Sequence, residues 1–522
     1  MPPLDLRLGI DVGGTNTDAV VLARDDRLLA KAKIPTSADV TTGIAGAIDA
    51  AISQLGEPAA RITHVMLGTT HATNAVLERR SLRRVAVLRI GAPATLAVRP
   101  LLAWPADLRA VVSAGEAIVG GGIEYDGREI APFDAEATRR FVDSLPGDVD
   151  GLAIASVFAP VSAEHELAAA EIVRGLRGDT LHVSLSHEIG SVGLLERENA
   201  TVLNSALVTV AHDVAEALRG ALAAHAIDPL RFFAQNDGTL MALEDALRYP
   251  VLTIGSGPAN SMRGAAYLTG ASDAIVADVG GTSTDVGVLA NGFPRESSSP
   301  VEIGGIRTNF RMPDLVAIAL GGGSIVANGG KTVAVGPQSV GFRLQEEALV
   351  FGGGTPTLTD AAVLAGRAEL GDRARAAASR DLLGRALGVA DAMLADAVDR
   401  VKTSRADQPL VVVGGGSVLV PERLPGVSEI SRPEHFEVAN AIGAAIASVS
   451  GSVDRIYHPG PGPGGRQAVL DEARAAATDL AVRAGANPER VEIVELEEIP
   501  LAYLTTPATR IRAKAAGPLA VD

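Results

Sequence analysis

The chain carries one short segment twice: DVGGTNTD from Asp11 to Asp18, and DVGGTSTD from Asp278 to Asp285. Around the first copy, LRLGID, DAVVLAR and RLLAKAKI predict three antiparallel strands joined by tight turns. Around the second copy, AIVADV and DVGVLA predict the same hairpin, and FPRESSSPVEI is expected to form its third strand. The repeat therefore extends to a whole supersecondary unit and predicts a fold with two related halves.

Between and beyond the copies, strand and helix patterns alternate, which predicts the α/β class. A chain of 522 residues exceeds the size of one hydrophobic core, so we expect two large lobes. Residues 1–190 are assigned to the first lobe and residues 191–458 to the second. The segment PGPGPGG opens residues 459–522, which are expected to form a linker and a small module with one helix (466–484) and one strand (491–495, continuing toward 501).

The composition excludes several classes of function. A net charge of −16 without a long basic run disfavours nucleic-acid and anionic-membrane partners. The chain has no cysteine, which excludes disulfides, thiolate nucleophiles and cysteine-ligated iron–sulfur clusters. Its start, MPPLDLRLGI, lacks the pattern of a secretory signal, and no apolar run reaches the roughly 18 residues of a membrane span. We therefore expect a cytoplasmic protein.

The repeated turn has the composition of a phosphate-binding loop. A glycine pair lets the backbone approach a ligand closely, so that N–H groups can converge on an anion, and neighbouring hydroxyls add donors. Two such hairpins that face each other would hold a triphosphate from both sides. A plain hairpin turn explains one copy but not two copies that restart the same unit. The residues predicted to bind the phosphates are Gly13, Gly14, Thr15, Asn16, Thr17, Gly280, Gly281, Thr282, Ser283 and Thr284.

Four aspartates accompany the glycine pairs and form the predicted catalytic set. Asp11 and Asp278 end their strands, where each could hold a hydrated magnesium ion beside phosphates. Asp18 and Asp285 begin the second strands and could orient water or metal. The sequence leaves open which aspartate acts on water and which on the metal.

Two further glycine clusters follow apolar strand patterns. One comprises Gly321, Gly322 and Gly323, and the other Gly414, Gly415, Gly416 and Ser417. The second could let a flat purine lie against the backbone, with a helix expected beyond it, although ordinary tight turns fit both clusters. The segment SGPANSMRGA from Ser256 predicts a helix N-terminus that could also meet phosphate.

The histidines show no metal-binding pattern. There is neither an HxH nor an HExxH motif among the nine histidines. His165 and His187 are expected on the surface or in loops, and His71 is expected to cap or pack a helix.

Several ordered motifs resemble one known family. They are GIDVGGTNTDAVVL, GTTHATNAVLERR, SLSHEIG with LLERENATVLNSAL, TIGSGPANSMRGA, ADVGGTSTDVGVL, and IALGGGSIV with VGPQSVG and GGGTPTLTDA. In this order they resemble the hydantoinase A and 5-oxoprolinase family, within the superfamily of acetate and sugar kinases, heat-shock ATPases and actin. The resemblance spans about residues 7–362, and VVVGGGSV extends it toward residue 450.

The resemblance implies a two-lobed, actin-like ATPase fold of duplicated ribonuclease-H-like domains with ATP and Mg²⁺ in the cleft. The two hairpins would match the two phosphate loops, and residues 414–417 the adenosine-side loop. In such enzymes ATP phosphorylates the carbonyl oxygen of a cyclic amide, such as a hydantoin or 5-oxoproline, and water then opens the ring. The implied activity is that of an ATP-dependent hydrolase of the hydantoinase or oxoprolinase type.

The chain also departs from the family pattern. After VGPQSVG it continues with FRLQEEALVFGGG where relatives carry PGPACYG, and longer members extend well beyond the PGPGPGG segment. Many relatives use a second hydrolase subunit for ring opening, so such a partner is expected here. The sequence does not decide whether the chain also forms a homo-oligomer. The alternatives are a small-molecule kinase of the same superfamily and a nucleotide-switched scaffold or activator ATPase.

Overall fold

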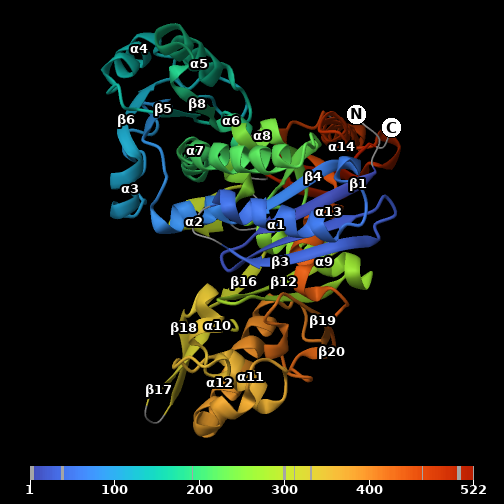
Figure 1. The fold of residues 1–522 in the computed structure, drawn as a ribbon. Helices are drawn as coiled ribbons and strands as arrows, with labels where there is room; N and C mark the ends of the chain where they lie inside the picture. Colours follow the sequence, from blue (N-terminus) through green and yellow to red (C-terminus); the bar gives the residue numbers. More distant parts are fainter. Residues whose placement is uncertain are drawn as a thin grey trace.

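The computed structural model describes residues 5–36, 40–190, 192–297, 301–310, 312–329, 332–460, 463–501 and 507–520. Within these residues the strands form three main sheets, of nine, six and four strands, and two short two-stranded ribbons. Figure 1 shows the nine-stranded sheet with its helices in the middle of the molecule, the six-stranded sheet below it and the four-stranded sheet at the upper left.

The nine-stranded sheet contains the first copy of the repeat. Its order is β22-β23-β21-β10-β9-β4-β1-β2-β3. β1 pairs antiparallel with β2 and parallel with β4, so Asp11 lies between Asp18 and Gly68. The predicted meander of the first copy is therefore present. The strands are β1 (Leu6–Val12), β2 (Asn16–Leu22), β3 (Leu28–Pro35), β4 (Ile62–Thr69), β9 (Leu230–Ala234), β10 (Leu240–Ala242), β21 (Val449–Tyr457), β22 (Glu492–Pro500) and β23 (Thr509–Gly517).

Both faces of this sheet are covered by helices. In β2, Ala19 and Val21 pack with α1 and α7, whereas Val20 and Leu22 pack with α13 on the other face. Successive side chains of a strand point to opposite faces, so a strand covered on both faces is apolar at nearly every position. The covering helices are α1 (Val40–Gln54), α7 (Leu194–Ala224), α8 (Leu243–Arg248), α13 (Ala439–Ile446) and α14 (Pro463–Arg483).

The six-stranded sheet contains the second copy of the repeat. β11 and β12 form its hairpin, with Asp278 opposite Asp285, and β19 pairs parallel with β11. The arrangement of hairpin and parallel neighbour repeats that of β1, β2 and β4. The strands are β11 (Ala274–Val279), β12 (Thr284–Ala290), β13 (Phe293–Pro294), β16 (Leu315–Ile318), β19 (Gln408–Val413) and β20 (Val427–Ser431).

The prediction of a third strand for the second copy is wrong. Only Phe293–Pro294 of the segment FPRESSSPVEI pairs with β12, as β13. Residues 298–300 lie outside the described residues, and Val301–Ile303 (β14) pairs with Ile306–Thr308 (β15) in a separate ribbon. β16 takes the third position on β12 instead. β16 reaches this position only after the chain has left the sheet to form the β14–β15 ribbon and has returned to it. A local sequence pattern carries no information about such a pairing.

The four-stranded sheet forms a separate layer between α2 and α7 in the sequence. Its strands are all parallel, in the order β6-β5-β7-β8. Buried residues of α4 and α5 pack against buried residues of β5 and β7 in this sheet. The elements of this region are α2 (His71–Glu78), β5 (Val85–Ala92), α3 (Ala106–Val112), β6 (Ser113–Gly120), α4 (Ala135–Ser144), β7 (Gly151–Ser156), α5 (Glu164–Arg177), β8 (His182–Leu185) and α6 (Ser186–Ile189).

The C-terminal module differs from the expected single helix and strand. α14 already begins at Pro463, inside the segment predicted as a linker, because proline is favoured in the first turn of a helix. The strand predicted from 491 toward 501 is present as β22, but a second strand that was not predicted, β23, follows it. β23 pairs with β21 along its whole length, so the module extends the nine-stranded sheet.

Helices α9 (Ser256–Thr269) and α13 cross where two glycines meet. A Cβ at Gly264 would lie 1.9 Å from the carbonyl oxygen of Ala439, and one at Gly443 would lie 1.8 Å from that of Asn260. The two backbones therefore touch, which only glycine permits at these positions. This crossing places the start of α9 beside the hairpin of the first copy.

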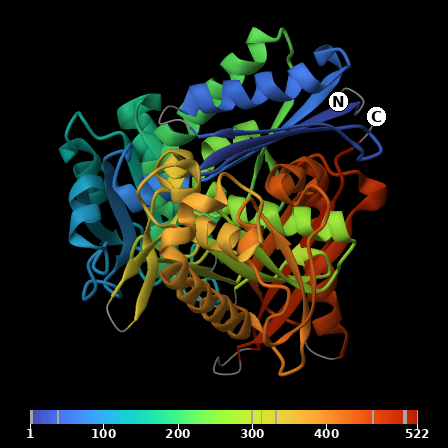
Figure 2. The same cartoon turned by 60° about the horizontal axis from the view of Figure 1, so that its bottom comes forward.

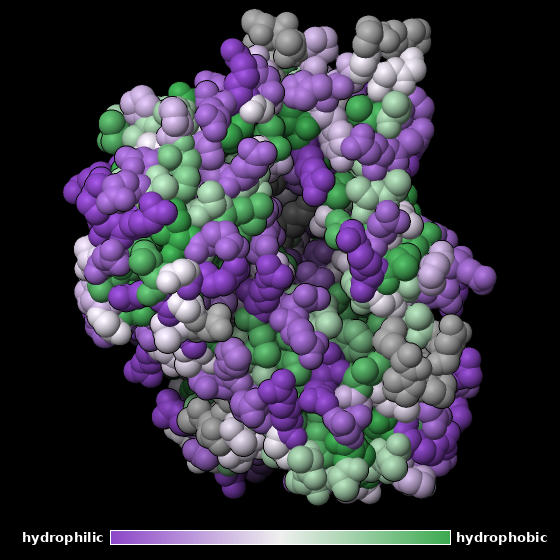
Figure 3. Space-filling model, turned by 90° about the horizontal axis from the view of Figure 1, so that it is seen from above, coloured by the Kyte–Doolittle hydropathy of each residue, from purple (hydrophilic) through white to green (hydrophobic). Residues whose placement is uncertain are grey.

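The remaining helices pack around the six-stranded sheet, where α11 and α12 share its apolar core. Figure 2 shows α12 as the long orange helix across the front of the molecule. Figure 3 shows hydrophilic and hydrophobic residues interspersed over the upper face, with a recess near its middle. Among the described residues, no helix is both long and apolar enough to span a membrane. The helices around the six-stranded sheet are α10 (Leu344–Glu347), α11 (Leu358–Ala365) and α12 (Arg380–Val401), and the second two-stranded ribbon consists of β17 (Ser324–Asn328) and β18 (Val333–Ser339).

Candidate functional site

The two repeated hairpins face each other. The hydroxyl oxygens of Thr15 and Thr282 lie 3.3 Å apart, although the residues are far apart in sequence. A Cβ added to Gly281 would lie 3.1 Å from Cγ2 of Thr15. The structure thus brings together the two loops that the sequence predicts to act on one ligand.

Each hairpin offers backbone N–H groups at its tip. Gly13 donates to the carbonyl of Asn16 at 3.0 Å, and Gly280 donates to that of Ser283 at 2.9 Å, which closes each turn. Among the described residues, the next two N–H groups of each turn have no hydrogen-bond partner. Successive N–H groups of this kind form an anion-binding concavity. The groups are those of Gly14, Thr15, Gly281 and Thr282.

Asp11 is buried at the end of β1 and is held by two asparagines. Nδ2 of Asn260, from α9, donates to Oδ1 at 3.0 Å, and Nδ2 of Asn440, from α13, donates to Oδ2 at 3.0 Å. Burial raises the pKa of Asp11 to about 7, with a contribution from the charges of Asp18 and Asp278, while the two amides oppose the shift.

Asp278 and Asp285 form the corresponding pair in the second hairpin. The hydroxyl of Ser261 donates to Oδ2 of Asp278 at 2.6 Å. Because Asn260 and Ser261 are adjacent in α9, one helix contacts the strand-end aspartates of both hairpins. Burial raises the pKa of Asp278, and it raises that of Asp285 to about 7 with help from the charge of Asp278.

Asp18 and two of the predicted threonines are engaged within the protein. Both oxygens of Asp18 accept from Nζ of Lys33 at 2.9 Å, and Lys33 also donates to the carbonyl of Glu437. The hydroxyl of Thr17 lies 3.2 Å from that of Thr36, and the hydroxyl of Thr284 donates to the Leu320 carbonyl at 2.6 Å. The threonine hydroxyls at the hairpin tips are therefore those of Thr15 and Thr282.

The loop at residues 321–323 supports the second hairpin. Gly322 donates to the Gly280 carbonyl at 3.1 Å, and Gly323 donates to the Gly281 carbonyl at 2.7 Å. The N–H of Gly321 is bound by Oγ of Ser324 at 2.9 Å. All three glycines are buried. The N–H groups of Gly322 and Gly323 therefore hold the backbone of the hairpin, and that of Gly321 bonds within its own loop, so none of the three is directed to a ligand.

The loop at residues 414–417 covers Asp278. Gly414 has a φ of +85°, and a Cβ there would lie 2.3 Å from Oδ1 of Asp278. Gly416 donates to the Val279 carbonyl at 2.7 Å, and Gly415 is exposed beside it. The buried hydroxyl of Ser417 has no partner among the described residues. The helix expected beyond this loop is a single 3₁₀ turn, Ser417–Leu419.

No ready-made metal centre is present in the described part of the chain, since no three histidine or acidic side chains there converge on one point. His71 begins α2, and its Nδ1 lies 2.7 Å from the hydroxyl of Thr69. Burial lowers the pKa of His71, which fits the packing role expected for it. His165 is buried, so the expected surface position is wrong for this residue.

The sequence reasoning missed the residues that hold the aspartates: Asn260, Ser261, Asn440 and Lys33. The segment SGPANSMRGA was noted only for its helix N-terminus. The signal in this segment is its Asn–Ser pair, because both side chains can donate hydrogen bonds to carboxylates. Asn440 carries no comparable signal in EVANAIGAAI.

The comparisons with known proteins identify the family of the chain. The sequence matches the model of the hydantoinase/oxoprolinase N-terminal region over residues 7–176 and the hydantoinase/oxoprolinase model over residues 197–372. The chain belongs to the hydantoinase/oxoprolinase family. Both hairpins of this family member lie within the matched residues.

The curated relatives of this hydantoinase/oxoprolinase chain include two proteins that are longer than it. The acetophenone carboxylase gamma subunit of Aromatoleum aromaticum is 26% identical over 390 residues, which cover 69% of this chain and 53% of that protein. An uncharacterized protein of Methanocaldococcus jannaschii is 25% identical over 393 residues, covering 69% and 56%. The chain spans about half the length of these relatives.

The solved structures that share the fold include two with high TM-scores. ATP-dependent caprolactamase from Pseudomonas jessenii has a TM-score of 0.78 at 20% identity, covering 98% of this chain and 88% of that chain. The nucleotide-free structure of an acetone carboxylase has a TM-score of 0.70 at 16% identity, covering 99% and 88%. The predicted α/β fold is confirmed, and the chain shares it with both of these structures.

Proposed function

We propose that the chain binds the triphosphate of ATP between its two glycine hairpins. The observation that carries this proposal is the 3.3 Å contact between Thr15 and Thr282, because it unites two turns with unpartnered N–H groups. Such groups bind anions without a large positive charge nearby. Both similar solved structures are of ATP-dependent enzymes, which supports the same proposal.

Magnesium fits the acidic side chains beside the two hairpins. The charges of Asp18 and Asp278 help to raise the pKa of Asp11, and that of Asp278 helps to raise those of Asp18 and Asp285. A divalent cation would relieve this repulsion. We assign Asp11 and Asp278 to the ion, because Mg²⁺ needs only one or two carboxylates when phosphates and water complete its shell. When bound, the ion neutralises charge on the phosphates.

The reaction we propose is the ATP-dependent opening of a cyclic amide. The carbonyl oxygen of the ring attacks the γ-phosphorus, the bond to the β-phosphate oxygen breaks, and ADP leaves. Water then adds to the activated carbon and the ring C–N bond breaks, which leaves an acyl phosphate. A second water hydrolyses this acyl phosphate to the ring-opened acid and free phosphate. The family and the similarity to a caprolactamase support this reaction class. The oxygen-phosphorylating step needs mainly positioning and charge neutralisation, which the hairpins can supply.

A carboxylase role is the second candidate. It is favoured by the relative named acetophenone carboxylase gamma subunit and by the structural likeness to acetone carboxylase. ATP would then activate a ketone or bicarbonate oxygen at the same hairpins. The same relative is one subunit of its enzyme and is longer than this chain. We therefore propose that this chain works with a second subunit.

The test is an ATP-hydrolysis screen over a panel of hydantoins, 5-oxoproline and larger lactams, with and without candidate partner proteins. We expect one cyclic amide to stimulate phosphate release and to appear as its ring-opened amino acid. Ketone-stimulated hydrolysis that requires bicarbonate would replace this function with carboxylation. Accumulation of a stable phosphorylated product would indicate a kinase.

The control for this screen is Asp11→Asn, which keeps the size of the side chain and removes its negative charge. We expect it to lose substrate-stimulated phosphate release by at least about a hundredfold, because the charge that holds the metal is gone. Undiminished release in this variant would remove the hairpin site from the reaction.

A further inference from the structure

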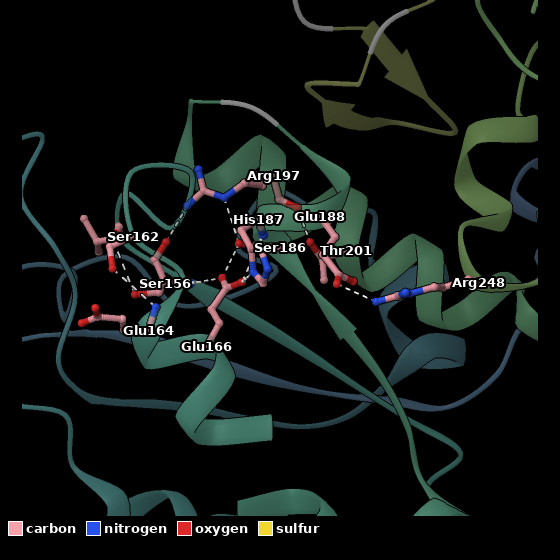
Figure 4. A network of polar contacts seen from close by, with 11 residues as sticks. Ser156, Ser162, Glu164, Glu166, Ser186, His187, Glu188, Arg197, Thr201 and Arg248 are labelled. Atoms are coloured by element: carbon pink, nitrogen blue, oxygen red, sulfur yellow. Dashed lines mark hydrogen bonds and ion pairs between the residues drawn. The ribbon is translucent and has the colours of Figure 1, made fainter. Parts of the chain in front are cut away.

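A second polar centre lies in the first lobe, where α5, α6 and the end of β7 meet. The carboxylate of Glu166 is fully buried and accepts hydrogen bonds from the N–H of Ser156 at 2.8 Å and from the hydroxyl of Ser186. The N–H of His187 donates to its other oxygen at 3.0 Å, and Nδ1 of His187 lies 2.6 Å from that same oxygen. Figure 4 shows these side chains converging on Glu166.

This contact fixes the imidazole of His187. With Nδ1 bound to a carboxylate, the neutral ring carries its proton on Nδ1 and leaves Nε2 as the acceptor. Nε2 has no partner among the described residues, and 20% of the side chain is exposed. His165 differs, since it is buried and both of its ring nitrogens are engaged, with the N–H of Gly122 and with Glu129. His187 therefore combines a fixed orientation with an available ring nitrogen.

Arg197 stabilises the same arrangement. It is buried at the start of α7, where its Nε donates to the hydroxyl of Ser186 at 2.9 Å and its Nη2 donates to the carbonyl of Ser156. Figure 4 places it on the far side of Ser186 from Glu166. Its positive charge balances the negative charge of the buried carboxylate. A buried charge needs such a partner. Glu166 is thus held from two sides.

The turn after His187 meets the second half of the chain. A Cβ at Gly190 would lie 2.5 Å from Oδ1 of Asn309, and Nδ2 of Asn309 lies 3.5 Å from the carbonyls of Val192 and Gly193. Asn309 follows the ribbon β14–β15. The turn that follows His187 therefore contacts the segment after β15.

We propose that His187, oriented by Glu166, is a proton-transfer site for the substrate amide. In this role Nε2 takes a proton from water as its oxygen bonds to the activated carbon, and Glu166 stabilises the imidazolium. The proton then passes to the ring nitrogen as the C–N bond breaks, which returns His187 to its neutral form. This assignment rests on the proposed ring opening, and it adds the base that the hairpins do not provide.

The activity test compares His187→Ala, Glu166→Gln and their combination in the full chain with its partner. His225→Ala is the matched control, because His225 also contacts a carboxylate, that of Asp49 at 2.6 Å, and is 24% exposed on the opposite end of α7. We expect His187→Ala to lower amide-stimulated turnover by about a hundredfold or more while the Kd for ATP stays unchanged. The double variant should lose no more than His187→Ala alone.

External imidazole should restore part of the turnover of His187→Ala, which a purely structural role would not allow. Wild-type turnover in His187→Ala, or a parallel loss of ATP affinity, would overturn the proposal.

A second measurement does not depend on the ring-opening reaction. Diethyl pyrocarbonate acylates accessible neutral imidazole nitrogens, and peptide mass mapping locates each modified histidine. We expect His187 to react in the ligand-free protein, His165 to resist, and Glu166→Gln to slow the reaction of His187. If His187 stays unmodified while His225 reacts, Nε2 is not available and the assignment is wrong, whatever the hairpins do.

Discussion

At the scale of single residues, the site depends on carboxylates placed where ionisation is unfavourable. Asp11 is 3% exposed, yet it receives only two neutral amide donors, from Asn260 and Asn440. Neutral donors compensate burial less than a cation does, so its pKa rises to about 7. Asp18 has the cation that Asp11 lacks, in Lys33. The unbalanced charge at Asp11 favours a ligand that brings positive charge.

The raised pKa predicts a pH dependence of nucleotide binding. Metal binding requires ionised Asp11, and the ionised fraction rises between pH 6 and pH 8 around a pKa of about 7. We therefore expect the affinity for Mg–ATP to rise by up to about tenfold over this range. Titration calorimetry at both pH values measures it, and Asp11→Asn should bind weakly with a flattened pH dependence.

The same shift affects stability in the opposite direction. The folded-state pKa of Asp11 lies above the ordinary value of 3.8, so the folded state binds the proton more tightly between about pH 4 and pH 7. Its contribution to the free energy of unfolding of the ligand-free protein therefore falls as pH rises through this window. Compared with Asp11→Asn, the wild type should lose stability from pH 5 to pH 7. A parallel pH dependence in the two proteins would contradict the shift.

At the scale of elements, the hairpins are the parts that the sequence predicted best. DVGGTxTD between apolar segments specifies both strands and turn, and the register Asp11 to Asp18 recurs as Asp278 to Asp285. The third strand of the second copy could not be predicted, because β16 is selected by a pairing that follows an intervening ribbon. The helix expected after Ser417 fails for a related reason, since the backbone just before it is fixed by the bond from Gly416 to the Val279 carbonyl of β11.

A hairpin variant separates ligand binding from folding. No atom lies within 4 Å of a Cβ added at Gly14, so Gly14→Val should leave the melting temperature unchanged. If phosphates occupy the tip of the hairpin, the larger side chain blocks them, and ATP affinity should fall by more than about tenfold, or ~1.4 kcal/mol. The matched control is Gly147→Val in the four-stranded region, where the surroundings are equally open. Equal ATP affinity in the two variants would place the phosphates elsewhere.

At the scale of the whole molecule, two of the contacts among the described residues join the nine-stranded sheet and its helices to the six-stranded sheet and its helices. One is the glycine crossing of α9 and α13. The other is a buried ion cluster, in which Nζ of Lys514 lies 2.9 Å from Asp237 and 2.8 Å from Glu296. Lys514 belongs to β23, so the C-terminal module ties the nine-stranded sheet to the second half. Nothing in the sequence around Lys514 indicated this role, because both of its partners are distant in the chain.

The central claim is that both hairpins bind one nucleotide. The most direct measurement is a crystal structure of the chain with Mg²⁺ and a non-hydrolysable ATP analogue. The account predicts that the β- and γ-phosphates lie within hydrogen-bonding distance of N–H groups from both hairpins, those of Gly14 or Thr15 and those of Gly281 or Thr282. A triphosphate that contacts only one hairpin, or that binds outside the cleft between Thr15 and Thr282, would contradict it.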